Sequence, residues 1–436
     1  MLKAKAATLT AQARDVEEET YRRVTMRIVP FLFFCYLAAY LDRVNVGFAK
    51  LQMLKELNFS ATVYGFGAGI FFLGYVLFEV PSNIVMHKVG ARLWIARIMI
   101  TWALISGAMA FVTTPIMFYV LRFLLGAAEA GFIPGVLLYL TYWYPANRRG
   151  RITAIFLAAI PMSSIFGGPL SGWILNSLDG SDGLSGWQWV FVVETIPSMI
   201  LGILTLIYLD DRVEHVTWLD AGEKQLIAQN IAREEHEKED LSQLSAAFKS
   251  GYVWLLGLIY FSIASGVYII SFWLPSIIKQ TGVSDPLSIG LLTAIPYAFA
   301  IVAMILVNQS GDRLRERRWH TVIPCLVTTV GLTLTAFAAG NTLLAMIGLT
   351  LGAAGASAAQ SCFWTLPASF LAGAAAAAGI ALVNSLGNIG GFASTFLVGW
   401  MSDLTHSTSS SLYLFAVLIA ISAGLLLTIP PKLVNK

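Results

Sequence analysis

Charged residues are scarce in this chain, and their scarcity excludes most classes of soluble protein. Of its 436 residues, 12% are charged and 57% are hydrophobic, whereas a typical soluble domain has about 25% charged residues. The formal net charge of +3 is also too small to indicate a nucleic-acid partner, because nucleic-acid-binding proteins carry a pronounced basic excess. The composition therefore indicates an integral membrane protein.

Cysteines are few, and metal-binding patterns are absent from the sequence. Cys35, Cys325 and Cys362 lie in apolar stretches without C-x-x-C spacing, so we expect neither a disulfide framework nor a zinc site. We interpret all three as packing residues. The five histidines lie far apart along the chain. We therefore expect no metal and no bound cofactor.

Motifs of nucleotide binding and of catalysis are missing too. No G-x-x-x-x-G-K-[ST] phosphate loop occurs, and no nucleophile–base arrangement indicates an enzyme. Residues 1–26 are rich in charge and lack the apolar core of a signal peptide, so we expect a cytosolic N-terminal tail. The driving force for any transport must come from an ion gradient or from the gradient of the substrate itself.

Long apolar runs are what the sequence has in abundance. A membrane-spanning helix needs about 20 apolar residues. Twelve runs meet this requirement, near residues 28–49, 61–86, 93–113, 116–141, 152–177, 187–209, 251–278, 287–310, 320–339, 342–366, 377–401 and 411–430. Their length indicates helices rather than the short alternating strands of an outer-membrane barrel. We predict an all-α membrane protein with twelve transmembrane helices in two six-helix halves, 27–209 and 251–430.

Basic residues predict the orientation of the spans in the membrane. They gather in the turns after the second, fourth and eighth runs, at Lys88, Arg92, Arg148, Arg149, Arg151, Arg313, Arg315, Arg317 and Arg318. The turns on the other side are nearly bare, with Lys50, Lys55 and Lys279 as exceptions. This bias places both termini, including the tail 431–436, in the cytosol, and we expect the inner (plasma) membrane of a cell.

A polar loop, residues 210–250, separates the two halves. Asp220 and Glu223 have capping-box spacing ahead of an apolar periodicity, which predicts a surface helix. We interpret the loop as a solvated cytosolic linker; the alternative is a regulatory docking site.

The whole chain, with six spans on each side of a central loop, resembles the major facilitator superfamily. That superfamily has a signature turn, roughly G-x-x-x-D-R-x-G-R-R, after the second and eighth spans. After the eighth span Asp312 and Arg313 match, while Asn308 and Arg315 stand where the superfamily has glycine. After the second span the stretch 83–92 matches in part. The resemblance implies a duplicated transporter whose site lies between the halves, near the membrane midplane.

A more specific resemblance rests on polar runs inside the spans. These runs are Tyr40-Leu41-Asp42-Arg43-Val44-Asn45, the stretch from Arg122 through Glu129 to Gly131, Pro81-Ser82-Asn83, and Asn384-Ser385-Leu386-Gly387-Asn388. Together they resemble the anion:cation symporter family, in particular its bacterial permeases for tartrate, phthalate and related carboxylates. The resemblance implies that Asp42 and Glu129 take part in proton coupling and that Arg43 and Arg122 bind the anion.

Asp42, Arg43, Arg122 and Glu129 also stand out on physical grounds. One charge at the centre of a spanning helix costs roughly 2.5–3.5 kcal/mol, so each needs a partner or water. Arg122 and Glu129 share a helix face ~10 Å apart, whereas neighbouring Asp42 and Arg43 point about 100° apart. A substrate carboxylate suits the planar arginine fork and could draw an arginine away from an acid, which would then take up a proton. Alternatively, buried ion pairs simply clamp two helices.

Further candidates follow from the resemblance. Tyr75, Ser361, Trp364 and Asn384 match positions that line the site in family members, although aromatic residues in apolar helices also serve as packing. We predict cytosolic latches between helix ends at Arg148, Arg149, Arg151, Asp312 and Arg313, with topology-setting charge as the alternative.

The sequence thus favours a monomeric importer of a small organic carboxylate that works by proton symport through alternating access. Gly167 to Gly172 partly resembles the glycine–proline motif of proton-driven exporters, so export is an alternative, although Ser171 interrupts the motif. A solute receptor that does not transport is a second alternative, but the loop 210–250 is too small to act as an output domain by itself. Sodium stays open as an alternative coupling ion.

Overall fold

The computed structural model describes residues 2–235, 250–338, 340–370 and 373–435, and every regular element in these ranges is helical. The helices are α1 (Leu2–Val44), α2 (Val46–Glu56), α3 (Ala61–Val89), α4 (Ala91–Ala108), α5 (Pro115–Glu129), α6 (Phe132–Thr141), α7 (Ala146–Leu157), α8 (Ala159–Ser177), α9 (Gly186–Tyr208), α10 (Ala221–Glu235), α12 (Gly251–Gln280), α13 (Pro286–Leu314), α14 (Arg318–Phe337), α15 (Thr342–Phe363), α16 (Thr365–Phe370), α17 (Gly373–Thr405), α18 (Ser409–Thr428) and α19 (Pro431–Val434). Short 3-10 turns are η1 (Met109–Phe111), η2 (Ser181–Gly183) and η3 (Val213–His215).

Twelve segments of the described chain are long and apolar enough to cross a membrane. Each overlaps one of the twelve predicted runs; the seventh, for example, is Gly251–Gln280 against the predicted 251–278. The prediction of an all-α multi-pass membrane protein is confirmed. It succeeded because the bilayer requires about 20 consecutive apolar residues per helix, a requirement that is written directly in the sequence.

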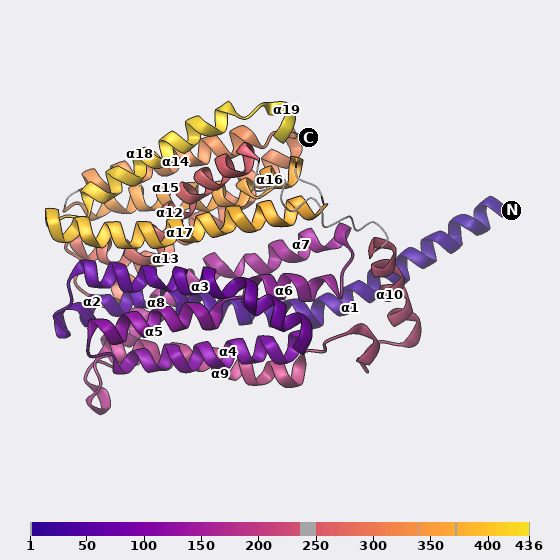
Figure 1. Ribbon diagram of the computed structural model, residues 1–436, viewed down its shortest axis with the longest axis horizontal. Coiled ribbons are helices and arrows are strands. Elements are labelled where there is room, and N and C mark those ends of the chain that lie inside the picture. Colours follow the sequence, from indigo (N-terminus) through magenta and orange to yellow (C-terminus); the bar gives the residue numbers. More distant parts are fainter. Residues whose placement is uncertain (1, 236–249, 339, 371–372, 436) are drawn as a thin grey trace.

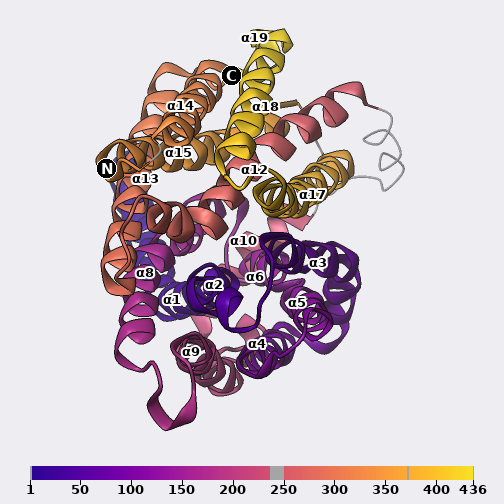
Figure 2. The ribbon, with the colours of Figure 1, turned by 90° about the vertical axis from the view of Figure 1, so that its left-hand side faces the viewer.

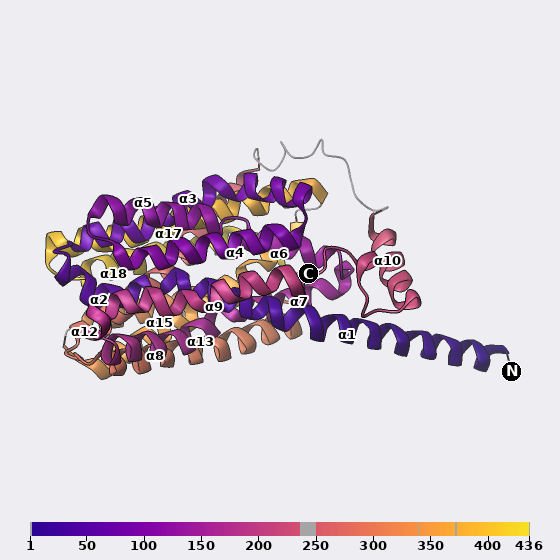
Figure 3. The ribbon, with the colours of Figure 1, turned by 90° about the horizontal axis from the view of Figure 1, so that it is seen from below.

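The helices run roughly along one axis and form two groups (Figure 1). Helices α1 to α9, the N-terminal half, lie on one side, and α12 to α19, the C-terminal half, lie on the other. Viewed along this axis, α2, α3 and α8 of the first half face α12, α17 and α13 of the second (Figure 2). Both termini and α10 lie at one end of the bundle, here called the terminal end (Figures 1 and 3).

Hydrogen bonds between the halves gather at the other end of the bundle, here called the opposite end. The Asp403 carboxylate of α17 accepts from the backbone N–H groups of Ala61 (3.0 Å) and Thr62 (2.8 Å), at the start of α3. Lys279 Nζ of α12 donates to the carbonyl of Leu51 at 2.8 Å. The halves are therefore closed against each other at the opposite end.

Helix α1 begins well before the membrane span. Residues 1–26 were predicted as a tail separate from the first span, but residues 2–44 form one continuous helix. Ion pairs along this extension, from Glu19 to Arg22 (2.9 Å) and to Arg23 (3.6 Å), have the three- and four-residue spacing that supports a helix. The charged N-terminal part of α1 is too polar for the bilayer, but its charges allow the helix to continue beyond the apolar span.

The surface helix predicted after Asp220 is α10. Its first turn has the reciprocal bonds of a capping box, from Glu223 N to Asp220 Oδ1 (2.8 Å) and from Asp220 N to Glu223 Oε2 (3.0 Å). Glu223 also accepts from Arg23 Nη1 at 3.1 Å, so α10 is attached to the extension of α1. The predicted linker continues through 236–249, which lies outside the described residues.

Candidate functional site

The fourth span is broken where it carries its acid. Helix α5 ends at Glu129, Ala130 has an extended ψ of 133°, and Gly131 has a left-handed φ of 88° before α6 begins. A Cβ on Gly131 would lie 2.2 Å from Ser82 Oγ, so only glycine fits both the backbone angle and the close approach of α3. We predicted an unbroken span; the break is instead the kind of helix discontinuity that marks binding sites in transporters.

Glu129 forms a buried ion pair with Arg43. Arg43 Nη2 of α1 donates to Glu129 Oε1 of α5, and the two residues are only 5% and 3% exposed. The sequence left open which arginine pairs with Glu129, and in the structure the partner is Arg43 rather than Arg122. Seven-residue spacing puts two side chains on one face, but two turns separate them, and the neighbouring helix α1 supplies the nearer cation.

Aromatic rings surround the Arg43 guanidinium. Its carbon lies 5.6, 5.1 and 5.4 Å from the ring centres of Tyr40, Phe71 and Tyr75, within the range of cation–π attraction. Tyr268 of α12 lies close enough to interact electrostatically with the same charge. The predicted site residue Tyr75 is therefore at the ion pair, and Tyr268 brings the C-terminal half to it.

Arg122 lies behind this pair rather than in it. The side chain is fully buried, and its Nε and Nη2 donate weakly, at 3.4 Å, to the carbonyls of Gly67 and Ala68 in α3. Its Nη1 has no hydrogen-bond partner among the described residues. Arg122 thus adds a positive charge close to the ion pair, from a position that the surrounding helices enclose.

Asp42 points into the N-terminal half, away from Arg43. Its carboxylate accepts from Ser106 Oγ of α4 at 3.1 Å and from Ser198 Oγ of α9. The expected divergence of neighbouring Asp42 and Arg43 is confirmed. No arginine pairs with Asp42 among the described residues, so the alternative of an Asp42–arginine clamp is wrong.

Glu194, Glu79 and Lys50 lie in the helices of the N-terminal half, and none of them was predicted as a site residue. Glu194 of α9 is fully buried and lies near Asp42; Glu79 of α3 faces the other half. Lys50, predicted as a loop charge, lies 8% exposed in α2, with Nζ 3.1 Å from the ring centre of Trp273. The sequence contained an indication of each residue, because each is a charged residue within an apolar run or at its border.

The candidate residues of the C-terminal half divide into two groups. Asn384 Nδ2 donates across the interface to Glu79 Oε1 at 3.3 Å. Ser361 instead accepts from Asn308 Nδ2 (2.7 Å), and Trp364 packs edge-on against Tyr260 at 4.7 Å. The structure therefore connects Asn384 to the N-terminal half, while the hydrogen bond of Ser361 to Asn308 and the ring contact of Trp364 with Tyr260 lie within the C-terminal half.

The predicted latch residues make contacts within each half. Arg148 of α7 pairs with Glu17 (3.2 Å) and Glu18 (2.7 Å) of α1, and Asp312 pairs with Arg317. Arg313 is exposed and Arg149 is partly buried, whereas the side chain of Arg151 lies outside the described residues. Asp312 thus joins the end of α13 to the start of α14, and Arg148 joins the start of α7 to the side of α1. Neither contact bridges the two halves, and the latch role stays a prediction.

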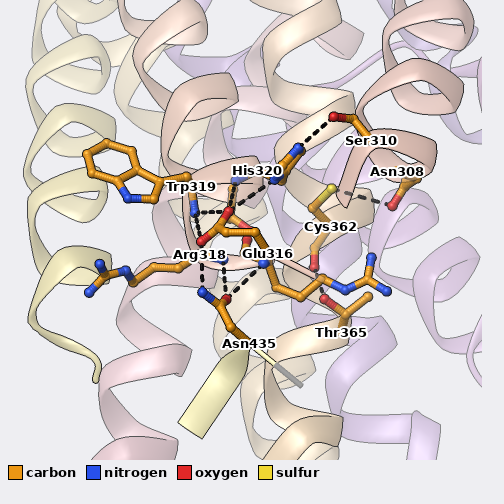
Figure 4. A network of polar contacts seen from close by, with 11 residues as sticks. Asn308, Ser310, Glu316, Arg318, Trp319, His320, Cys362, Thr365 and Asn435 are labelled. Carbon is orange, nitrogen blue, oxygen red and sulfur yellow. Dashed lines mark hydrogen bonds and ion pairs between the residues drawn. The ribbon is translucent and has the colours of Figure 1, made fainter. Parts of the chain in front are cut away.

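The backbone of the signature turn after α13 shows how Arg315 replaces the glycine of the superfamily pattern. Arg315, at the position of a glycine, has a left-handed φ of 49° and ends α13. Glu316 then accepts from the backbone N–H of Trp319 (2.8 Å) and from Asn435 Nδ2 (3.0 Å), which fixes the start of α14 and the C-terminal segment (Figure 4). The turn therefore has, at Arg315, the left-handed backbone conformation that glycine adopts most easily.

Comparison with known proteins agrees with this architecture. Residues 32–395 match the family model of the Major Facilitator Superfamily. The chain is 48% identical, over 99% of both chains, to a putative metabolite transport protein, NicT, of Pseudomonas putida. It is 48% identical to a putative tartrate transporter of Agrobacterium vitis, over 94% of both chains, and 40% identical to a quinolone resistance transporter of Acinetobacter baumannii, over 95% of both. A solved D-xylose–proton symporter shares the fold, with a TM-score of 0.73 and 16% identity over 94% of this chain and 99% of that one.

Proposed function

Because this chain belongs to the major facilitator superfamily and is a transporter rather than an enzyme, we propose that it imports a small organic carboxylate together with protons. The names of the relatives at 48% identity, a metabolite transporter and a tartrate transporter, support a small organic substrate. They also make tartrate the first substrate to test.

The observation that carries the proposal is the buried Arg43–Glu129 ion pair. It lies at a helix break, beneath aromatic rings from both halves. A substrate carboxylate matches the geometry of Glu129 and can take its place on the guanidinium with two parallel hydrogen bonds. Removal of one partner from a buried ion pair leaves an uncompensated charge that costs about 3–5 kcal/mol. Glu129, once displaced, lowers this cost by taking up a proton.

Proton and anion binding are then reciprocal. If the anion favours protonation of Glu129, the proton raises the affinity for the anion by the same factor. Arg122 holds a second positive charge close by, which favours an anion in the site. Tyr75 and Asn384 offer hydrogen bonds to the substrate's remaining oxygens, and Trp364 and Ser361 extend the site into the C-terminal half.

We propose that the terminal end faces the cytosol of the inner membrane. The basic turns with Arg92, Arg148 and Arg318 lie at this end, next to the segments that carry the termini or follow α9. With the halves closed at the opposite end, access to the site is from the cytosol. The latch residues Arg148, Arg149, Arg151, Asp312 and Arg313 act at this end when it closes.

Exchange in proteoliposomes tests the proposal. Purified monomeric protein should exchange external labelled tartrate for internal unlabelled tartrate without any imposed gradient. An inward proton gradient should then drive accumulation, and an equal sodium gradient should not. Absence of exchange with tartrate and with a panel of sugar acids and aromatic acids would refute carboxylate transport. Accumulation by the sodium gradient alone would refute proton coupling.

A second candidate function is proton-driven export. The relative at 40% identity that is named a quinolone resistance transporter supports it. An exporter would release tartrate or a quinolone from loaded vesicles when protons enter from the other side. The same vesicles distinguish the two functions, because import requires the proton and the substrate to move in one direction.

A further inference from the structure

The N-terminal half contains a second buried acidic site that the ion pair does not use. Asp42 accepts from Ser106 and Ser198, and Glu194 Oε1 accepts from Ser171 Oγ of α8. Asp42 is 2% exposed and Glu194 is fully buried. Ser198, which donates to Asp42, lies one helical turn from Glu194 on the same face of α9, and this places the Asp42 carboxyl near that of Glu194.

If both Asp42 and Glu194 were ionised, they would need a positive charge nearby, and no basic side chain forms an ion pair with either carboxyl group among the described residues. Ser106 and Ser198 donate to Asp42, Ser171 donates to Glu194, and the neutral side chains of Trp102 and Asn45 also approach these carboxyl groups. Glu129 of α5, which also acts on Asp42 electrostatically, is itself an acid and is already paired with Arg43. Two carboxylates in a low-dielectric interior cannot both stay ionised at reasonable cost.

Unsatisfied polar atoms point into the same site. Glu194 Oε2 has no hydrogen-bond partner among the described residues, and neither has the side-chain Oδ1 or Nδ2 of Asn45. Asn45 is 1% exposed and lies beside the Glu194 carboxyl. Asn45 and Ser171 also line a small cavity of about 10 Å³, which is close to the space that one water molecule occupies. A buried acceptor without a partner calls for a bound proton, cation or water.

We infer that Asp42 and Glu194 form a proton-binding pair in which two carboxyl groups share one proton. The serines of α4, α8 and α9 hold the two groups, and Asn45 with a water in the small cavity connects the pair to the surface of the N-terminal half that faces α13. On that side Tyr297 of α13 is the titratable neighbour, beyond Ser164. Helix α8 contributes the Ser171 hydroxyl to the pair, and α4 contributes the Ser106 hydroxyl and the neutral indole of Trp102.

The inference deepens the proposed function, because it adds Glu194 to the groups that couple protons to the anion. Each uptake event would then involve two separate proton sites, Glu129 at the substrate and the Asp42–Glu194 pair behind it. Proton binding by the pair does not depend on which substrate is carried, so it can be tested directly.

The test is an infrared titration of the protonated carboxyl band on the intact protein in lipid, over a pH series. The band of Asp42 is identified by its loss in Asp42→Asn. In Glu194→Gln this band should titrate at a pH lower by about one unit or more, because the proton is released more easily once the like-charged neighbour is removed. In the Asp42→Asn/Glu194→Gln double variant no titrating band of this pair should remain. Glu214→Gln, a change of an exposed glutamate on η3, is the matched control and should leave the band unchanged.

Two results would overturn the inference. If the Asp42 band titrated at the same pH with and without Glu194, the carboxyl groups would be independent. If replacement of choline by sodium removed the band, the site would hold a metal cation. Elution as a single species in size-exclusion chromatography shows that each variant is folded. Failure of the wild type to exchange tartrate would refute the proposed transport function but leave the titration, and hence the pair, intact.

Discussion

The two halves of the molecule share an architecture but differ sharply in their buried chemistry. The spans of the N-terminal half enclose the buried charges Asp42, Arg43, Lys50, Arg122, Glu129 and Glu194. In the C-terminal half, no buried residue in the described parts of the spans is Asp, Glu, Lys or Arg; its buried polar residues are serines, threonines and Asn388. We propose from this difference that charge and proton chemistry belong to the N-terminal half, and that the C-terminal half recognises neutral features of the substrate.

This division has a physical advantage for coupling. Charges that interact within one half keep their geometry while the halves move, so protonation can be tied to anion binding in every conformation. Hydroxyl, amide and aromatic groups on the other half can meet and leave the substrate without a buried charge being stranded. Variants in the two halves should therefore fail in different ways.

The largest effect is expected from Arg43→Ala. It removes the carboxylate fork and leaves Glu129 as an unpaired buried acid, a cost of about 3–5 kcal/mol. Tartrate exchange should fall by at least about 100-fold, since each 1.4 kcal/mol is a factor of about ten. Arg43→Lys, which keeps the charge but not the planar fork, should retain part of the activity. Exchange by Arg43→Ala at the wild-type rate would contradict the assignment of this residue to the anion.

Glu129→Gln should separate exchange from coupling. The amide keeps the shape of the side chain but cannot give up or accept the coupled proton, so exchange should stay within about tenfold of the wild type. Accumulation driven by a proton gradient should be abolished. Both are measured in the same vesicles, with and without the gradient. Gradient-driven accumulation that persists in this variant would show that Glu129 is not a coupling group.

A change in the C-terminal half should reduce affinity and leave coupling intact. Asn384→Ala removes one neutral hydrogen bond, worth about 0.5–1.5 kcal/mol, and should raise the half-saturating tartrate concentration by roughly two- to tenfold. Accumulation at saturating tartrate should still respond to the proton gradient. The matched control is Asn230→Ala on α10, where the amide contacts Tyr21 at 3.2 Å. Loss of proton coupling in Asn384→Ala would contradict the proposal that coupling depends on the N-terminal half alone.

The smallest effect on transport is expected from Glu316→Gln, outside the spans. Burial alone would raise the pKa of Glu316, but N–H donors from Trp319, His320 and Asn435 outweigh it and hold the pKa below its usual value. The ionised group therefore stabilises the fold above the ordinary glutamate pKa of about 4.3, and this stability is lost as pH falls through the lower folded value. Glu316→Gln should cost about 1 kcal/mol in thermal unfolding at neutral pH and less in acid. Tartrate exchange should be unchanged; an exchange defect at full folding would implicate the turn in transport.

The sequence predicted the spans well and the partners of the buried charges poorly. Hydrocarbon thickness constrains each span locally, and so does the capping box at Asp220. The partner of Glu129 depends on how α1 lies against α5, and Arg43 and Glu129 stand 86 positions apart in the sequence. Helical spacing alone therefore left both arginines open as partners, and in the structure Arg122 instead packs against the carbonyls of α3.

The break at Gly131 and the acid Glu194 illustrate two further limits on reasoning from pattern. A glycine in an apolar run is common, and its positive φ is visible only in the structure. Glu194, by contrast, interrupts the apolar run of α9 and carries the same signal as Glu129. What hid it was the absence of a nearby basic residue in sequence, and the structure shows that its environment is a second acid and serines.

The attachment of α3 to Asp403 has a consequence for the equilibrium between the two orientations of the proposed transport cycle. Helix α3 has its own cap, Ser60, whose Oγ accepts from Val63 N at 3.2 Å, and that cap travels with the helix. The second cap, Asp403, belongs to the other half, and under the proposed alternating access it is broken whenever the opposite end opens. A capping interaction is worth about 1 kcal/mol, roughly a fivefold change in an equilibrium constant. The resting orientation is thereby biased by a helix end far from the substrate, weakly enough for thermal motion to reverse it many times while the protein is at work.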